Sequence, residues 1–176
     1  MPSTEGWVDR YFEDFKVGDV YRHSVGRTVS EADNTWFTLL TVNTQQLHFN
    51  RECGERSEFG RMLVNSCLTL AIVTGLTVAD VTQHVVANLG WDDVRLPHPV
   101  FVGDTLWAES MVLSARPSRS RPGAGIVEVG TRGLNQNGDV CVTFRRTALI
   151  HRRGADEAAL PFPDAATPIS AAFAAP

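Results

Sequence analysis

The sequence predicts a single α+β domain in which an antiparallel sheet wraps around one central helix. The chain has 176 residues, 43% of them hydrophobic and 20% charged, which suits one domain with a substantial core. Residues 64–75 are apolar on nearly every helical face, which is typical of a helix that must be enclosed. About five segments rich in β-branched residues follow, and several alternate apolar and polar positions.

The stretch SEADNTWFTLL predicts the first helix. Ser30 is a suitable N-cap, and Asp33 lies at the third helical position, where an acidic side chain can return a hydrogen bond to the cap. Trp36, Phe37 and Leu40 then form one apolar face, and Trp36 and Phe37 are expected in the core.

The stretch VNSCLTLAIVTG predicts the second, central helix over 64–75, where Gly75 is a stop signal. Residues 77–81 are expected to add one further turn with Thr77 as its cap. The start of the central helix offers N–H groups without helical partners and the positive end of the helix dipole.

The predicted strands occupy residues 84–91, 92–101, 104–116, 124–135 and 139–150. The sequence NQNGD at 135–139 indicates a hairpin turn, so the strands are expected to form an antiparallel meander. A central helix followed by such a sheet is the arrangement called the hotdog fold. We expect this domain to span residues 1–153, and the Ala- and Pro-rich residues 154–176 to form a loosely ordered tail.

Composition argues against several classes of protein. The net charge of -4 gives no basic field for nucleic acid or an anionic membrane, and no apolar run approaches a membrane span. Three scattered cysteines do not suggest disulfides, and the N-terminus does not resemble a signal peptide, so a cytoplasmic location is expected. No His or Cys spacing suits a metal, so no metal site is predicted.

His48 is the first candidate for chemistry, because it follows the polar loop TVNTQQ and histidine can act as a neutral base near physiological pH. By spacing alone, a structural or surface histidine is the commoner outcome. The sequence around His48 has to decide between the two interpretations.

The order of the motifs resembles the MaoC-like hydratases, also called (R)-specific enoyl-CoA hydratases, over residues 11–153. It comprises a helix, a polar loop ending in Leu-His, the sequence EFGRMLVNS that opens an apolar helix, and LPHPVFVGDTL that opens a strand. The chain is also similar to the mesaconyl-CoA hydratase branch of these proteins.

The loop of that family reads Ser-Gly-Asp-x-Asn-Pro-Leu-His, and it corresponds here to residues 41–48. His48 is kept, Val42 occupies the glycine position, and Asn43 replaces the aspartate. The Asn-Pro pair is replaced by two glutamines. The family's step into the central helix, whose glycine N–H binds the thioester oxygen, corresponds to Asn65 and Ser66.

The resemblance implies hydration of an enoyl-CoA thioester, with CoA as part of the substrate and no separate cofactor. His48 is the expected base, Asn43 orients a water or the imidazole, and the Ser66 N–H is the oxyanion donor. Asn65 is expected beside the substrate. The resemblance also implies a homodimer or higher homo-oligomer, with the CoA site at the subunit boundary.

Asn43 cannot exchange a proton as an aspartate does. His48 would then both take and return the proton, or another group supplies the acid, or hydratase activity has been lost. An amide would, however, not repel a substrate that carries its own carboxylate. We therefore hypothesise a short, branched, dicarboxylic substrate such as mesaconyl-CoA or itaconyl-CoA. Arg61 is either a solvated loop arginine or the group that meets the substrate carboxylate or a CoA phosphate. The basic loop at 116–121, which includes Arg119, is a further candidate for the phosphates.

Two other interpretations remain open. An acyl-CoA thioesterase of the same fold would need a carboxylate on or near the central helix, and residues 64–75 contain none. A non-catalytic acyl-CoA binding or regulatory protein is consistent with the missing aspartate, because a fold does not determine a function.

Overall fold

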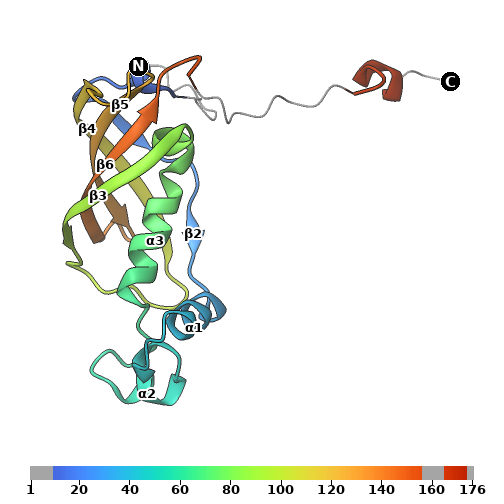
Figure 1. Cartoon of the computed structure of the whole chain (residues 1–176). Helices are drawn as coiled ribbons and strands as arrows, with labels where there is room; N and C mark the ends of the chain where they lie inside the picture. Colours follow the sequence, from blue (N-terminus) through green and yellow to red (C-terminus); the bar gives the residue numbers. More distant parts are fainter. Residues whose placement is uncertain (1–9, 156–164, 174–176) are drawn as a thin grey trace.

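The computed structural model describes residues 10–155 and 165–173, and it confirms an α+β architecture built on an antiparallel sheet (Figure 1). The three α-helices are α1 (Glu31–Leu40), α2 (Arg51–Arg56) and α3 (Ser66–Leu76). The strands are β1 (Val20–Arg22), β2 (Arg27–Thr28), β3 (Val85–Arg95), β4 (Thr105–Pro117), β5 (Ala124–Leu134) and β6 (Val140–His151). Short helical turns are η1 (Phe12–Asp14), η2 (Gln46–His48), η3 (Val78–Thr82) and η4 (Ile169–Phe173).

The strand order in the sheet is β1-β4-β5-β6-β3, and β2 also pairs with β4. Strands β4, β5 and β6 form the predicted meander, with the hairpin turn between β5 and β6 where NQNGD predicts it. The prediction of a complete five-strand meander is wrong, because β3 pairs with β6 and lies at the edge of the sheet.

The two strands predicted over 84–101 are a single strand, β3, with several bulges. Beyond β3 the sequence LPHPV leaves the sheet, because proline removes a backbone donor and disfavours a paired strand. The chain regains one bridge, between Leu63 and Phe101, and then enters β4 through a turn at Gly103, whose φ is 96°. Strand β4 thus begins at the end of LPHPVFVGDTL, the sequence expected to open a strand.

Helix α3 packs against β4 and β6, with α1 and α2 near its N-terminal end (Figure 1). Val73 of α3 is fully buried and lies over Gly133 of β5, where a Cβ would come within 2.5 Å of the Val73 side chain. The absence of a side chain at Gly133 therefore lets the helix approach the sheet closely. The surrounding core contains Val29, Val64, Leu68, Val73, Val100, Leu106, Ala108, Cys141, Val142 and Phe144.

The prediction that the central helix is enclosed is wrong for this chain on its own. Cys67, Ala71 and Gly75 lie on one face of α3 and are exposed, because the sheet covers only the opposite face. The turn predicted after the helix is confirmed as η3. Thr77 does not cap η3 with its side chain, which instead donates to the Thr74 carbonyl and accepts from Arg146.

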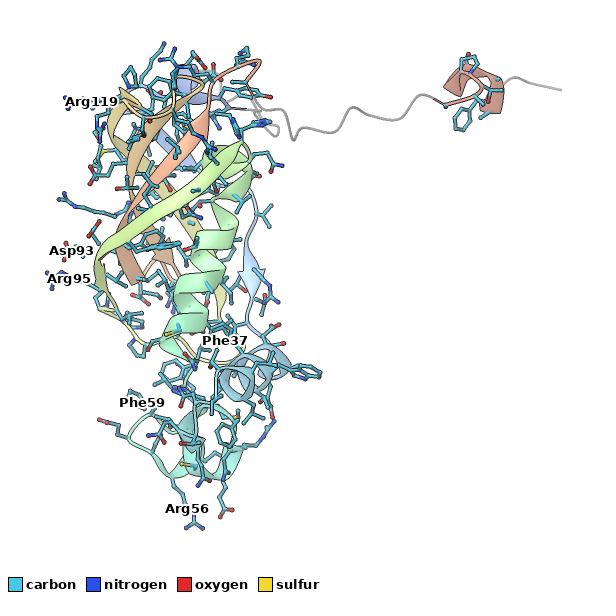
Figure 2. The ribbon with its side chains drawn as sticks, viewed as in Figure 1. Phe37, Arg56, Phe59, Asp93, Arg95 and Arg119 are labelled. Atoms are coloured by element: carbon cyan, nitrogen blue, oxygen red, sulfur yellow. The ribbon has the colours of Figure 1, made fainter. Side chains whose placement is uncertain are left out.

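Helix α1 begins with the predicted capping box, in which Ser30 and Asp33 exchange hydrogen bonds. The predicted apolar face is wrong, since Trp36 and Leu40 are 69% and 74% exposed. Phe37 is partly buried and packs against the core near the N-terminal end of α3 (Figure 2). The fully buried residues of α1 are polar, Asn34 and Thr38, which lie one helical turn apart.

About half of the predicted tail, residues 154–176, lies outside the described residues. Within residues 165–173 the chain forms the short turn η4. That the tail is loosely ordered stays a prediction.

Candidate active site

His48 lies on the turn η2, between α1 and α2, and is 9% exposed. Its Nδ1 is 2.9 Å from the main-chain carbonyl oxygen of Leu63. Because a carbonyl only accepts hydrogen bonds, Nδ1 must carry the proton of the neutral ring, which leaves the lone pair on Nε2. In the described part of the chain Nε2 has no hydrogen-bond partner, yet it is not among the fully buried polar atoms. The ring therefore presents its basic nitrogen to the accessible surface.

The N-terminus of α3 is capped by Asn65. The side-chain oxygen of Asn65 accepts a hydrogen bond from the Cys67 N–H at 2.9 Å, and its amide donates to the Thr38 hydroxyl at 3.2 Å. Asn65 is 4% exposed and its polar atoms are bound within the protein. Its predicted role in substrate binding stays a prediction.

Ser66, the first residue of α3, is exposed. Its N–H lies at the helix start, where no helical carbonyl is available, and within residues 10–155 and 165–173 no acceptor contacts it. The Leu63 carbonyl, which accepts the hydrogen bond from the His48 ring, lies shortly before Ser66 in the sequence. The structure thus brings the predicted base and the predicted oxyanion donor to the same end of α3.

Asn43 lies on the loop before His48 and is partly buried. Its side-chain oxygen accepts a hydrogen bond from the Gln45 N–H at 2.9 Å, so the amide shapes the loop as an Asx turn does. No hydrogen bond joins Asn43 to the His48 ring in the described residues. Its predicted role in orienting water or the imidazole stays a prediction.

Val42, directly before Asn43, has a φ of 58° in the left-handed region. The family loop has glycine at this position, and glycine adopts that conformation without steric cost. This chain therefore places valine in a backbone conformation that glycine adopts more readily.

Arg61 lies between α2 and α3, and its guanidinium carbon is 3.6 Å from the centre of the Phe101 ring. Phe59 packs beside the same ring, with 6.0 Å between ring centroids. No carboxylate contacts Arg61 in the part of the chain that the structure describes. Figure 2 shows Phe59 at the α2 end of the molecule and Arg119 at the opposite end, so the basic loop at 116–121 lies far from Arg61 in the same chain.

Sequence reasoning missed Asn34 and Thr38, which connect the site from α1. Asn34 donates to the main-chain carbonyls of His48 and Leu63, and it accepts from the Asn65 N–H. The available signal was a pair of polar residues spaced by four within a helix. That signal was hidden because Trp36, Phe37 and Leu40 offered an alternative buried face.

A histidine–carboxylate pair lies at the other end of α3 from His48. His23 Nδ1 is 2.8 Å from Asp80 Oδ2, and His23 Nε2 is 3.0 Å from the Ser110 hydroxyl. Burial is the main cause that lowers the pKa of His23 below its ordinary value, and the Asp80 carboxylate acts in the opposite direction. Ser110 is 1% exposed, and Asp80 is also paired with Arg10. Because this network lies at the opposite end of α3 from His48, it does not supply the acid missing beside His48.

In residues 10–155 and 165–173, no helix has the length and apolar character needed to cross a membrane. The same residues contain no cluster of three or more His, Cys, Asp or Glu side chains that could hold a metal ion. The candidate site therefore consists of an imidazole, a helix N-terminus, amide side chains and one arginine.

A histidine base beside open helical N–H groups can activate water and stabilise an oxyanion, which suits chemistry at a thioester. The chain resembles in fold a Mycobacterium tuberculosis protein described as a double hotdog, with a TM-score of 0.75 and 23% identity over 82% of this chain and 45% of that one. It also resembles a MaoC-like dehydratase from Rhodospirillum rubrum, with a TM-score of 0.71 and 30% identity over 82% of this chain and 98% of that one. A hotdog domain with this histidine loop defines a MaoC-like protein.

The sequence model of mesaconyl-CoA hydratase matches residues 5–160. The chain is 35% identical to a mesaconyl-CoA hydratase of Cereibacter sphaeroides over 144 residues, which are 82% of this chain and 42% of that one. The chain belongs to the mesaconyl-CoA hydratase family. It spans less than half the length of this curated relative.

Proposed function

We propose that the protein reversibly hydrates an enoyl-CoA thioester. His48 Nε2 removes a proton from water, the hydroxyl adds to Cβ, and the proton is delivered to Cα, so that the elements of one water cross the double bond. Negative charge that develops on the thioester oxygen is stabilised by the Ser66 N–H at the positive end of α3. The observation that carries this proposal is the hydrogen bond from His48 Nδ1 to the Leu63 carbonyl, which leaves Nε2 as the base.

The proposed substrate is a short, branched, dicarboxylic enoyl-CoA such as mesaconyl-CoA or itaconyl-CoA. The family description and the name of the Cereibacter relative support this choice. Arg61 supports it independently, because its guanidinium is held on Phe101 without a carboxylate partner in the described residues. Asn43 supports it too, since a neutral amide in place of aspartate would not repel a second carboxylate.

The decisive assay measures loss of the conjugated thioester and release of free thiol in parallel, with mesaconyl-CoA, itaconyl-CoA and crotonyl-CoA. Hydration without thiol release is expected. Thiol release would instead support a thioesterase. The absence of any carboxylate on α3 argues against that activity. Binding of the thioesters without either reaction would support a non-catalytic acyl-CoA protein.

His48→Ala tests the base and is expected to lower kcat by about 10²- to 10⁴-fold, the usual contribution of a positioned general base. His98→Ala is the matched control, because His98 is exposed and its ion-pair partner in the described structure is Asp139, at 3.6 Å. A His48→Ala enzyme with the full hydration rate would exclude this site assignment.

Arg61→Ala and Asn43→Asp test the charge of the substrate. Both substitutions are expected to raise KM for mesaconyl-CoA while leaving crotonyl-CoA nearly unaffected. Arg56→Ala is the control for Arg61, since Arg56 points away from the body at the tip of α2 and pairs with Glu52 (Figure 2). An equal effect of Arg61→Ala on both substrates would assign Arg61 to CoA, and a preference for crotonyl-CoA would exclude the dicarboxylic substrate.

We also propose that the protein is at least a homodimer. Edge strand β3 exposes large apolar side chains, including Leu89 and Trp91, and one face of α3 is uncovered. The relatives of twice the length support the same conclusion, because a second copy of this chain would occupy the place of their other half.

A further inference from the structure

Asn34 of α1 is completely buried, and its carboxamide connects three separate segments of the candidate site. The amide nitrogen donates to the His48 carbonyl at 2.7 Å and to the Leu63 carbonyl at 3.0 Å. The amide oxygen accepts from the Asn65 N–H at 2.9 Å. One side chain thus joins the histidine turn, the segment before the central helix and the cap of that helix.

The orientation of this carboxamide is fixed by its partners. Two of them are carbonyl oxygens, which only accept, and the third is an N–H group, which only donates. The flipped amide would place oxygen against oxygen and nitrogen against nitrogen, so only one orientation satisfies all three. An aspartate has the same shape but no donor at neutral pH, and it would leave both carbonyls without this partner.

The Leu63 carbonyl makes this connection important for the base. It accepts from Asn34 Nδ2 and from His48 Nδ1, so its two lone-pair positions are both used. Leu63 lies on an irregular segment that, among the described residues, makes one bridge, to Phe101. Asn34 therefore holds in place the acceptor that decides which nitrogen of His48 carries the proton.

We propose that Asn34 is the positioning residue for His48, acting through the Leu63 carbonyl to fix the imidazole with its proton on Nδ1 and its basic lone pair on Nε2. The inference rests on the proposed function only in assigning His48 as the base of the hydration reaction. Asn34 does not touch the substrate. Asn34 also accepts a hydrogen bond from the Asn65 N–H at the start of α3. One side chain therefore fixes the position of the base relative to the oxyanion donor.

Asn34→Asp is the informative variant, because it keeps the shape and the acceptor and removes both donors. ¹⁵N NMR of the His48 ring at neutral pH is expected to show the Nδ1-protonated tautomer in the unmodified protein and a mixture of tautomers in Asn34→Asp. With mesaconyl-CoA, kcat is expected to fall by about 10- to 100-fold, the scale of a small misplacement of a reacting group, with KM changed less than about threefold.

Thr38→Val is the matched control. Thr38 lies one turn after Asn34 on the same buried face and binds Asn65 but neither His48 nor Leu63. Its substitution tests general loosening of this face, and it is expected to keep the Nδ1-protonated tautomer of His48.

The NMR measurement needs no substrate, so it separates this inference from the proposed function. A protein that hydrates none of the thioesters, yet shows the tautomer change in Asn34→Asp, would sustain the role of Asn34 and refute the reaction. If Asn34→Asp does not fold, Asn34→Ala and the tautomer of the unmodified protein provide the test. An Nε2-protonated His48 in the unmodified protein, or a folded Asn34 variant with an unchanged tautomer, would overturn the inference.

Discussion

Val42 adopts a backbone conformation that β-branched residues rarely occupy, with a φ of 58°. Its side chain is 83% exposed, so it gains little from packing in return. The loop that carries Asn43 and leads to His48 therefore stores local strain, as is often found beside functional sites.

Val42→Gly is expected to raise the free energy of unfolding by up to about 1 kcal/mol. Removing the left-handed strain of an L-residue contributes about 1–2 kcal/mol, and the extra conformational entropy of glycine in the unfolded chain costs about 0.5–1 kcal/mol. Urea unfolding of both proteins measures the difference. Val17→Gly is the control, since Val17 is also exposed but does not have a positive φ, and it should destabilise. Loss of stability in both variants would contradict the strain.

His23 gives the protein a stability that depends on pH. Burial lowers the pKa of His23 in the folded protein, while an unfolded histidine titrates near pH 6.5. As the pH falls below about 6.5, the unfolded chain binds a proton that the folded chain does not, so the contribution to stability is complete above that pH and decreases below it. The charged groups near this ring are Asp80, Arg10 and Arg146.

Denaturant unfolding of the protein and of His23→Gln between pH 8 and pH 5 tests this behaviour. The stability difference between the two proteins is expected to shrink as the pH falls through the acidic part of that range. A difference that stays constant across the range would show that His23 has no lowered pKa.

At the scale of the elements, the contact between α3 and β5 depends on Gly133. A Cβ at this position would lie 2.5 Å from a methyl group of Val73 and 2.9 Å from one of Val142. Overpacking of this kind in a core costs typically about 1–3 kcal/mol.

Gly133→Ala is therefore expected to lower the free energy of unfolding by about 1–3 kcal/mol, measured by urea denaturation. Adding Val73→Ala should cost less in the Gly133→Ala background than alone, because the new methyl group occupies part of the space vacated. Gly90→Ala is the control, since a Cβ at Gly90 has no neighbour within 4 Å. Equal stability of Gly133→Ala and Gly90→Ala would contradict the close approach.

The predictable elements are those whose evidence is local. The start of α1 could be predicted from Ser30 and Asp33, because both partners of the capping box lie within one turn. The place of β3 beside β6 could not, since it depends on pairing between segments far apart in the chain. Trp36 was assigned to the wrong face because apolar periodicity does not indicate which face of a helix meets the core.

The same division applies to the candidate site. His48 could be singled out by its loop and by the family resemblance. Its ring partner could not, because that partner is a main-chain carbonyl, at Leu63, which has no sequence signature. Asn34 was missed for a related reason, since its three partners are all backbone groups.

At the scale of the whole molecule, the exposed edge of β3 and the uncovered face of α3 predict self-association. Sedimentation analysis is expected to show a dimer or a larger assembly. Leu89→Lys, at a β3 side chain that is 53% exposed, should shift the protein toward the monomer. Met111→Lys on β4, 45% exposed, should leave the assembly intact, and a monomer at all concentrations would contradict the prediction.

The position of β3 also affects the order in which the chain can fold. β3 ends at Arg95, but its partner β6 begins at Val140, after both β4 and β5. On a ribosome, β3 is therefore complete while its hydrogen-bonding partner has not yet been made, and its apolar side chains stay unpaired until the end of the domain emerges. Pairing of β3 with β6 closes a long loop and is expected to be a late step, during which the strand is open to aggregation.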